Sequence, residues 1–281
     1  MDGEASRELI VWALQEDLGK EGDVTTSAIF GDEPGSARLT SKGTGILAGC
    51  AVFAQVFNEV DSSTSVDFKS ADGDSIEPGD VVAVVHGRAS SLLAGERVAL
   101  NFISFLSGIA TATRAYVTAA SRKGAQTTIL DTRKTLPGFR ELSKYAVRVG
   151  GAQNHRMGLY DMVLIKDNHI DLTGSIEAAV RRVRAKWGDR FSIEVECRTL
   201  AEVAQALDAK VDIIMLDNMP PGLIRKAVKS AAGRAKIEVS GNMDLDAVKR
   251  IAGKGIDFIS VGKLTHSVIS FDFSLKVEAL E

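Results

Sequence analysis

Five side chains that can carry positive charge fall close together in the middle of this 281-residue chain: Arg133, Lys134, His155, Arg156 and Lys166. A single arginine is more often a solvated surface charge, whereas cations in a group repel one another. Unit charges about 4 Å apart repel one another by about 4 kcal/mol at an effective dielectric constant near 20. Arginine forks pair well with carboxylates and phosphates. We therefore predict that this group binds a polyanionic ligand.

Two acidic residues, Glu196 and Asp217, end successive β-rich runs. Opposite a cationic group, two such carboxylates can hold Mg²⁺ through water or bind sugar hydroxyls. They can also stabilise the positive charge of an oxocarbenium-like transition state. The alternative is an internal ion pair with Lys134 or Lys166. Both interpretations can hold together, because an empty site must balance its own charges.

A third group of residues offers backbone donors rather than side chains. The turn Ser240-Gly241-Asn242 precedes a predicted helix that begins near Leu245, and Gly262 ends the last β-rich run. Exposed N–H groups at such turns bind phosphate. Taken alone this turn is a weak signal, but the loops after the last two strands are the usual phosphate site of α/β barrels.

The elements that must position these residues form a series of strand, polar tip and helix. The runs rich in Ile and Val end at Asp131, Lys166, Glu196, Asp217, Ser240 and Gly262, at intervals of 21–35 residues. Such spacing fits a strand, a helix and two short loops, and the apolar runs suggest parallel strands buried on both faces. Ligands bind at the carboxyl ends of such strands in both open sheets and barrels. We favour a barrel, because polar tips on every strand converge only if the sheet closes.

The first part of the chain has a different pattern. A helix is predicted over 6–18 with Gly19 as its C-cap, and another long helix, or two consecutive ones, over 91–121. Between them lie short β-rich runs at 37–39, 46–56, 65–68 and 81–85. We predict a first domain of helices and short strands over 1–107, a barrel domain over 108–265, and a tail over 266–281 that packs back on the first domain.

Composition excludes several functions. The 34 Lys and Arg against 37 Asp and Glu give a net charge of −3, which argues against nucleic-acid binding. The N-terminal segment has no signal-peptide pattern, and the apolar stretch 45–57 is too short and interrupted to span a membrane. The two cysteines, predicted to be packing residues, have no metal-ligand spacing and fit a reducing compartment, the cytoplasm.

The remaining histidines are weaker candidates for the site. His169 follows a strand end and is more readily a loop residue than a catalytic group, and His86 is expected at the surface. His266, past the last strand, is expected to be structural or to neighbour a phosphate. No nucleophile elbow, P-loop or dinucleotide-binding fingerprint is found in a suitable context.

Several long strings in the chain resemble the quinolinate phosphoribosyltransferase family, the decarboxylating nicotinate-nucleotide pyrophosphorylases of NAD biosynthesis. The most specific are DTRKTLPGFR, from Asp131 to Arg140, and NHRMGLYD, from Asn154 to Asp161. Shorter matches run in order along nearly the whole chain: EDLGxxGDVTT from Glu16, ERVALN from Glu96, IKDNH from Ile165, EVE from Glu194, MLDN from Met215, SGN from Ser240 and SVG from Ser260.

The resemblance implies an N-terminal α/β sandwich domain joined to an incomplete TIM-type barrel. It implies that quinolinate meets Thr132, Arg133, His155, Arg156, Lys166 and, from a neighbouring subunit, Arg97. Phosphoribosyl pyrophosphate would bind along Lys134, Glu196, Asp217, Ser240, Gly241, Asn242 and Gly262, with Lys134, Glu196 and Asp217 as the catalytic residues. Mg²⁺ would accompany this substrate without direct protein ligands, and no organic cofactor is expected. A homodimer or higher homo-oligomer is implied, with no nucleic-acid or membrane partner.

Three other functions remain open on these residues. A phosphoribosyltransferase-like relative associated with molybdenum transport shares the TRKT and HR elements. A non-catalytic, phosphate-binding barrel is disfavoured by the retained carboxylates Glu196 and Asp217. A nicotinate phosphoribosyltransferase would use a monocarboxylate, for which this number of cations is excessive.

Overall fold

A computed structural model describes residues 3–121 and 127–279, so the predicted ends at 1–2 and 280–281 lie outside the described residues. The chain divides into two compact units. The first comprises Met1–Arg114, Thr135–Gly151 and Leu264–Glu281, and the second comprises Ala115–Lys134 and Ala152–Lys263. Each unit is therefore assembled from segments that are separated in the sequence.

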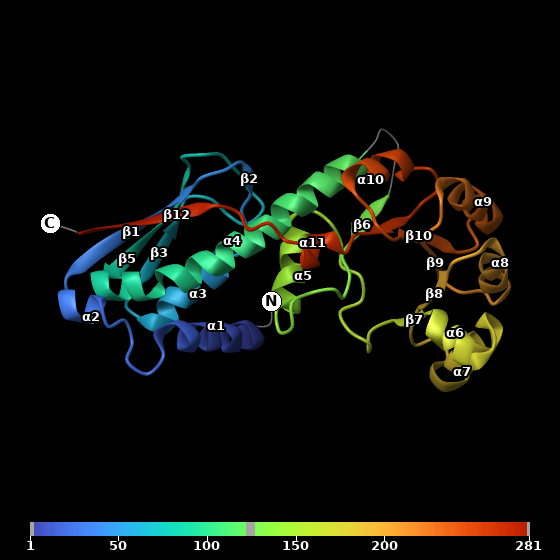
Figure 1. Cartoon of the computed structure of the whole chain (residues 1–281), viewed down its shortest axis with the longest axis horizontal. Helices are drawn as coiled ribbons and strands as arrows, with labels where there is room; N and C mark the ends of the chain where they lie inside the picture. The colour runs from blue at the N-terminus through green and yellow to red at the C-terminus, as the bar shows by residue number, and fades with distance from the viewer. Residues whose placement is uncertain (1–2, 122–126, 280–281) are drawn as a thin grey trace. The chain divides into compact units, whose positions relative to one another are not determined.

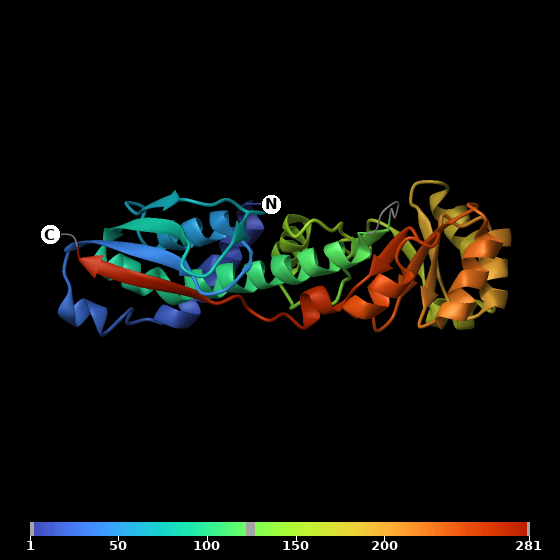
Figure 2. The same cartoon turned by 90° about the horizontal axis from the view of Figure 1, so that it is seen from above.

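The first unit contains an antiparallel sheet in the order β12-β1-β5-β3. Its central strands are β1 (Pro34–Ser41) and β5 (Val81–Arg88), with β3 (Ser65–Phe68) at one edge. The other edge is β12 (Phe273–Ala279), within the tail 266–281, and it pairs with β1 along the full length of that strand after Pro34. Figure 2 shows β12 in red running beside β1 in blue. Two short strands, β2 (Gly45–Ile46) and β4 (Ser75–Ile76), form a separate pair.

The helices that belong wholly or largely to this unit are α1 (Gly3–Leu18), α2 (Thr26–Ile29), α3 (Cys50–Val60), α4 (Ala89–Ala120), α5 (Arg140–Val149) and α11 (Lys263–His266). The predicted strand over 46–56 is wrong, because only its start is extended and α3 follows. The strand β2 ends at Ile46, and Gly49 adopts a left-handed conformation (φ 106°) as the residue that precedes α3. The apolar residues beyond it, Val52, Phe53, Val56 and Phe57, recur at helical spacing and are buried.

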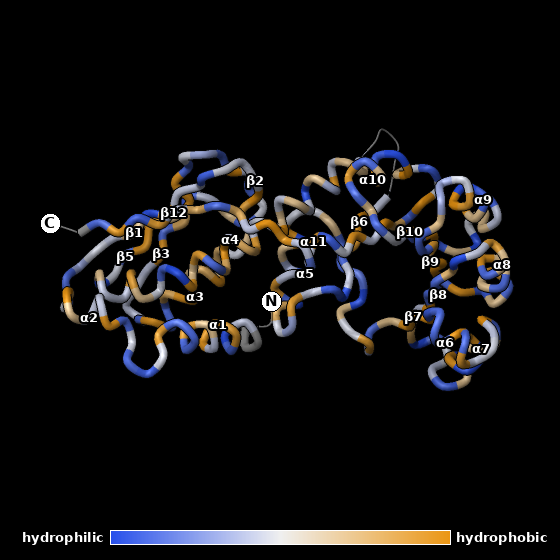
Figure 3. The backbone as a smooth tube through the Cα atoms, viewed as in Figure 1, coloured by the Kyte–Doolittle hydropathy of each residue, from blue (hydrophilic) through white to orange (hydrophobic). Residues whose placement is uncertain are grey.

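Helix α4 is a single helix of 32 residues, as one of the two sequence alternatives expected. Among the described residues it is the one helix long and apolar enough to cross a membrane by length and composition. Because 61% of its most apolar window is buried within the protein, it is a core helix of the fold. In Figure 3 hydrophobic stretches along α3 and α4 alternate with hydrophilic ones, as expected for helices that cover a core on one side.

The second unit contains six parallel strands in the order β6-β11-β10-β9-β8-β7. They are β6 (Thr128–Leu130), β7 (Val163–Ile165), β8 (Ile193–Cys197), β9 (Ile213–Asp217), β10 (Lys236–Ser240) and β11 (Phe258–Ser260). Within the described ranges the edge strands β6 and β7 do not pair with each other, so the barrel is incomplete. The predicted class, an α/β sandwich-type domain with an incomplete TIM-type barrel, is confirmed.

Helices follow the strands of this unit: α6 (Asp167–Thr173), α7 (Ile176–Trp187), α8 (Leu200–Asp208), α9 (Pro221–Ala231) and α10 (Leu245–Ile251). Figure 1 shows α7, α8 and α9 along one side of the sheet. Local sequence sets their starts: Thr199 and Glu202 form a capping box on α8, and Asp244 caps α10.

Candidate active site

The parallel register gathers polar side chains on one face of the second sheet. Glu196 pairs with Met215, Met215 pairs with Glu238, and Asp217 pairs with Ser240. Residues in register on neighbouring strands point to the same face, and alternate residues of one strand do so too. Glu194, Glu196, Asp217, Glu238 and Ser240 therefore share a face. The residues between them, such as Leu216 and Val239, are fully buried on the other face.

A buried aspartate at the end of β6 holds the segment that carries His155 and Arg156. Asp131 is fully buried and accepts hydrogen bonds from Asn154 Nδ2 at 2.5 Å and from the His155 backbone N–H at 2.9 Å. Further along, Asp161 accepts hydrogen bonds from the backbone N–H groups of Met157 and Gly158. The backbone that carries His155 and Arg156 is thus held by hydrogen bonds on both sides of these two residues.

Arg156 is brought near other charged groups by this segment. Burial and then the charge of Arg133 lower its pKa, whereas Glu194 and Asp161 act in the opposite direction. The guanidinium also donates through Nη1 to the Met162 carbonyl oxygen at 3.3 Å. Two predicted cations therefore lie close enough to repel each other, which is the condition that favours an anionic ligand.

Lys166 and the acidic pair form a second charged group. Lys166 Nζ lies 3.9 Å from Glu196 Oε2. Burial and then repulsion by Asp217 raise the pKa of Glu196, and Lys166 opposes this rise. The predicted internal ion pair is therefore present for Lys166, and the carboxylate pair is also present, as the sequence allowed.

The turn after β10 lies against the turn after β9. Asn218 donates its backbone N–H to the Ser240 carbonyl oxygen at 3.0 Å and its side-chain amide to Asp217 at 2.8 Å. Gly241 has φ 101°, and a Cβ there would lie 2.2 Å from Asn218 Oδ1. Only glycine fits this close approach, so Asp217, Ser240 and Gly241 are held as one unit.

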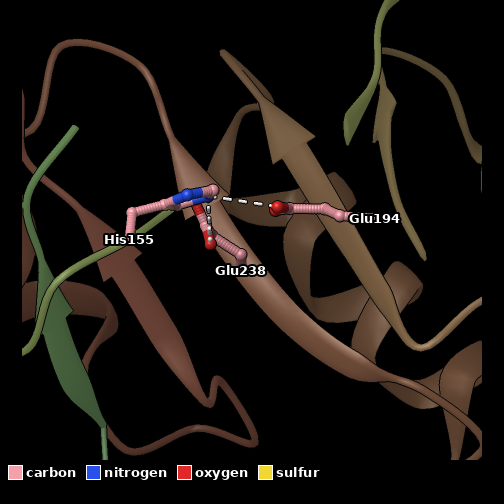
Figure 4. Close-up of side chains that lie close together, drawn as sticks. All are labelled: His155, Glu194 and Glu238. Atoms are coloured by element: carbon pink, nitrogen blue, oxygen red, sulfur yellow. Dashed lines mark ion pairs between the residues drawn. The ribbon is translucent and has the colours of Figure 1, made fainter. Parts of the chain in front are cut away.

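A buried cluster lies beneath the cations, formed by His155, Glu194 on β8 and Glu238 on β10. His155 Nε2 is 3.1 Å from Glu194 Oε2 and 3.6 Å from Glu238 Oε2. Figure 4 shows the imidazole directed at both carboxyl groups. Burial raises the pKa of Glu194 to about 7, against the effects of a hydrogen bond from Glu238 and the charge of Arg156. Burial and then the charge of Glu194 raise the pKa of Glu238 to about 8.

The other predicted site residues have less defined surroundings. Thr132 Oγ1 accepts the backbone N–H of Lys134 at 3.1 Å, and the Lys134 side chain is exposed. Gly262 follows β11, and Asn242 is exposed with φ 46°. Arg97 is exposed on α4 in the first unit, whereas every other predicted site residue belongs to the second unit.

Sequence reasoning missed Glu194 and Glu238 as site residues and gave Asp131 only as a strand end. The signal that could have found the glutamates is the alternation in SIEVE and KIEVS, where glutamates occupy every second position of buried strands. Strands buried on both faces by apolar residues would not contain them. Among the weaker candidates, His169 Nδ1 accepts the Lys166 backbone N–H, and His86 is exposed as predicted.

The two cysteines differ from the prediction in one respect. Cys197 is fully buried, but Cys50 is only half-buried, at the start of α3. Burial raises the pKa of both thiols, that of Cys197 to about 12. The thiolate form that would be needed for a nucleophile or a metal ligand is thereby disfavoured.

An incomplete α/β barrel with cations and an acidic pair near its strand ends fits the phosphoribosyltransferase class. Family models agree: the C-terminal domain of quinolinate phosphoribosyl transferase matches residues 109–276, and its N-terminal domain matches residues 23–107. The chain belongs to the quinolinate phosphoribosyltransferase family.

Individual relatives cover almost the whole chain. A probable nicotinate-nucleotide pyrophosphorylase (carboxylating) of Bacillus subtilis is 45% identical, over 93% of this chain and 90% of its own length. NadC from Streptococcus pyogenes has a TM-score of 0.95 at 42% identity, covering 100% of this chain and 99% of that one. The nicotinate-nucleotide pyrophosphorylase from Francisella tularensis has a TM-score of 0.93 at 38% identity, covering 99% and 98%. The likeness therefore extends over both units.

Proposed function

We propose that the cations and carboxylates of the second unit are the active site in which this enzyme transfers a phosphoribosyl group to quinolinate. As a quinolinate phosphoribosyltransferase, the chain is a pentosyltransferase of NAD biosynthesis. Its products are nicotinate mononucleotide, pyrophosphate and CO₂. The observation that carries the assignment of the site is that two like-charged pairs occur in the second unit: Arg133 repels Arg156, and Asp217 repels Glu196.

Quinolinate carries two adjacent carboxylates, and the cation group suits them. Arg133, Arg156 and Lys166 would bind these carboxylates, with Thr132 at the same strand end and His155 at the base of the group. This binding offsets the repulsion between Arg133 and Arg156. A monocarboxylate would leave part of that repulsion uncompensated, so the dianion is the favoured acceptor.

Phosphoribosyl pyrophosphate would bind along the remaining strand ends. Its 5′-phosphate would lie at the turns of Ser240, Gly241, Asn242 and Gly262, because the loops after the last two strands of such barrels bind phosphate. Lys134 would bind the pyrophosphate, and Glu196 and Asp217 would face the ribose. The two carboxylates also suit Mg²⁺ reached through water, because hard oxygen groups already repel each other there. Bound with this substrate, Mg²⁺ would supply charge neutralisation of the leaving pyrophosphate.

The reaction requires little proton transfer from the protein. The quinolinate ring nitrogen forms a bond to ribose C1 while the C1–O bond to pyrophosphate breaks and the oxygen keeps the electron pair. Glu196 and Asp217 stabilise the oxocarbenium-like charge that develops at C1. The bond from ring C2 to its carboxylate then breaks, CO₂ leaves, and the electron pair stays on C2 beside the positively charged nitrogen. A proton from solvent completes the product. Positioning and charge placement therefore account for most of the catalysis.

We also propose a homodimer or higher homo-oligomer, with Arg97 of each subunit completing the quinolinate site of a neighbour. Its exposure on α4 and its location in a different unit from all other site residues support this role. The cytoplasm is the proposed compartment, supported by two free thiols.

Mixing subunits that carry Arg97→Ala with subunits that carry Lys134→Ala tests this assignment. Each variant alone should have little activity. Random reassortment into dimers makes about half of them mixed, and one site of each mixed dimer is intact, so about a quarter of wild-type activity should return. An absence of rescue in confirmed mixed oligomers would show that Arg97 does not act across subunits, whatever the acceptor.

A further inference from the structure

Two buried carboxyl groups in the second unit have no role in the reaction as described. Glu194 is 0% exposed and Glu238 is 1% exposed. Apart from the His155 ring, both oxygens of Glu194 and Oε2 of Glu238 meet no hydrogen-bond donor among the described residues, whereas Glu238 Oε1 accepts the Ser260 hydroxyl at 2.5 Å. Two full negative charges in such a place would cost several kcal/mol each. A proton held between the carboxyl groups removes one charge and supplies a missing donor.

The surroundings of the pair indicate which carboxyl group carries the proton. Glu194 faces two cations, Arg156 and Lys166, both of which favour its charged form, and Glu196 opposes them. Glu238 faces the charge of Glu194, which favours its protonated form, while His155 and Ser260 act against it. The strands packed beside them contribute apolar partners in register: Leu164 and Ile213 beside Glu194, and Met215 and Phe258 beside Glu238.

The histidine above the pair has both ring nitrogens engaged. The backbone N–H of Arg156 donates to His155 Nδ1 at 2.7 Å, so Nδ1 is an acceptor and the ring proton is on Nε2. Nε2 is the nitrogen directed at the carboxyl groups, nearer to Glu194 than to Glu238 (Figure 4). In a doubly protonated ring, the Nδ1–H and the Arg156 backbone N–H would be two donors facing each other, which is unfavourable. A cation bound by these three residues would need a lone pair on Nε2, which this tautomer does not offer.

We propose that protonated Glu238 donates a hydrogen bond to the Glu194 carboxylate, which also accepts the His155 Nε2–H, so that the three residues form a buried series of hydrogen bonds that positions His155 and, through its Nδ1, the Arg156 backbone. His155 is then a neutral positioning residue and not a charged ligand of the substrate. The positive charge that meets the quinolinate carboxylates comes from Arg133, Arg156 and Lys166. This proposal rests on the proposed function only for the test that measures the KM for quinolinate.

Because one glutamate donates and the other accepts, replacing each of them with glutamine should have different effects. Glutamine has the shape of a protonated carboxyl group and can donate its amide proton, so Glu238→Gln should leave the series of hydrogen bonds intact. Glu194→Gln removes the only charge among the three hydrogen-bonded residues. It also places an amide group against the two donors, Glu238 and His155 Nε2–H. We expect the KM for quinolinate to change less than about threefold in Glu238→Gln and to rise about tenfold or more in Glu194→Gln, with a smaller change in kcat. A purely structural role would affect both variants alike.

The direct test is nuclear magnetic resonance of the protein with ¹⁵N-labelled histidine, at about pH 7.5 and without substrate. The chain has only 4 histidines, and single His→Gln substitutions at 86, 169 and 266 leave His155 to be assigned by elimination. Long-range proton–nitrogen correlations should show an Nε2–H tautomer for His155 in the wild type and in Glu238→Gln, and an altered signal in Glu194→Gln.

An Nδ1–H tautomer or a doubly protonated ring in the wild type would overturn the proposal, even if the glutamine variants failed to fold. The same holds if Glu238→Gln perturbs the His155 signal as much as Glu194→Gln does. Because this readout needs no turnover, it stands or falls separately from the acceptor assignment.

Discussion

Asp61 of the first unit and the glutamates on the sheet of the second unit have opposite surroundings. In the first unit, Asp61 accepts hydrogen bonds from Ser63 and Ser91 and pairs with Arg88, and these donors hold its pKa well below the usual range. In the second unit, burial raises the pKa of Glu194, Glu196 and Glu238. The first arrangement stabilises the fold, whereas the second costs folding free energy at neutral pH. Such costs concentrate where charge is needed for binding or catalysis.

The largest effect that follows from this comparison concerns Glu196. Replacing it with glutamine removes a charge near the proposed oxocarbenium centre, so we expect kcat to fall about 10²- to 10³-fold. The free energy of unfolding should stay within about 0.5 kcal/mol of the wild-type value or rise, because a disfavoured charge is lost. Steady-state kinetics and urea denaturation measure the two quantities.

A matched control is Glu177→Gln, which removes an exposed carboxylate that pairs with Arg181 on α7. Its activity should equal that of the wild type. If Glu196→Gln lowered the free energy of unfolding as well as kcat, Glu196 would have a structural role like that of Asp61 in the first unit. The contrast between the two units would then be wrong.

A smaller effect should appear in the pH dependence of stability. Glu238, and below about pH 7 Glu194 as well, keep their protons in the folded protein above their ordinary pKa of 4.5. The folded state then binds more protons than the unfolded state, so their contribution is fully retained below about pH 4.5 and lost as the pH rises to about 7–8. The slope is about 1.4 kcal/mol per pH unit for each carboxyl group that stays protonated. Urea unfolding of the wild type and Glu238→Gln from pH 5 to pH 8 should show a flatter profile in the variant.

Asp61→Asn in the first unit is the contrasting control for this series. Its lowered pKa means that Asp61 contributes stability above its ordinary pKa of 3.8, and this contribution is lost only as the pH falls further. From pH 5 to pH 8 the variant should therefore lose a constant amount, about 1 kcal/mol. Parallel profiles for the wild type and Glu238→Gln would contradict the account of the buried pair.

The sequence allowed prediction of the strand series, because each strand is a short apolar run with a polar end. The strand ends at Asp217 and Ser240 fall where the polar tips place them, and β7 ends one residue before Lys166. The segment 46–56 could not be predicted as well, since its apolar content suits a strand or a helix equally. The left-handed Gly49, whose conformation is visible only in the fold, decides between them.

The site was predicted to the extent that its residues lie at strand ends. Glu194 lies three residues before the end of β8 and Glu238 two residues before the end of β10. Their importance depends on strand register, which brings β8 and β10 to either side of β9. Likewise, the roles of the His155 nitrogens follow from backbone geometry at Arg156. Residue type and spacing alone carry neither kind of information.

The most direct test of the account is a steady-state assay with phosphoribosyl pyrophosphate, Mg²⁺ and either quinolinate or nicotinate as acceptor. The cation group predicts that quinolinate gives CO₂ and nicotinate mononucleotide in equal amounts, whereas nicotinate gives little product. Turnover of nicotinate without turnover of quinolinate would contradict the dicarboxylate assignment of Arg133, Arg156 and Lys166.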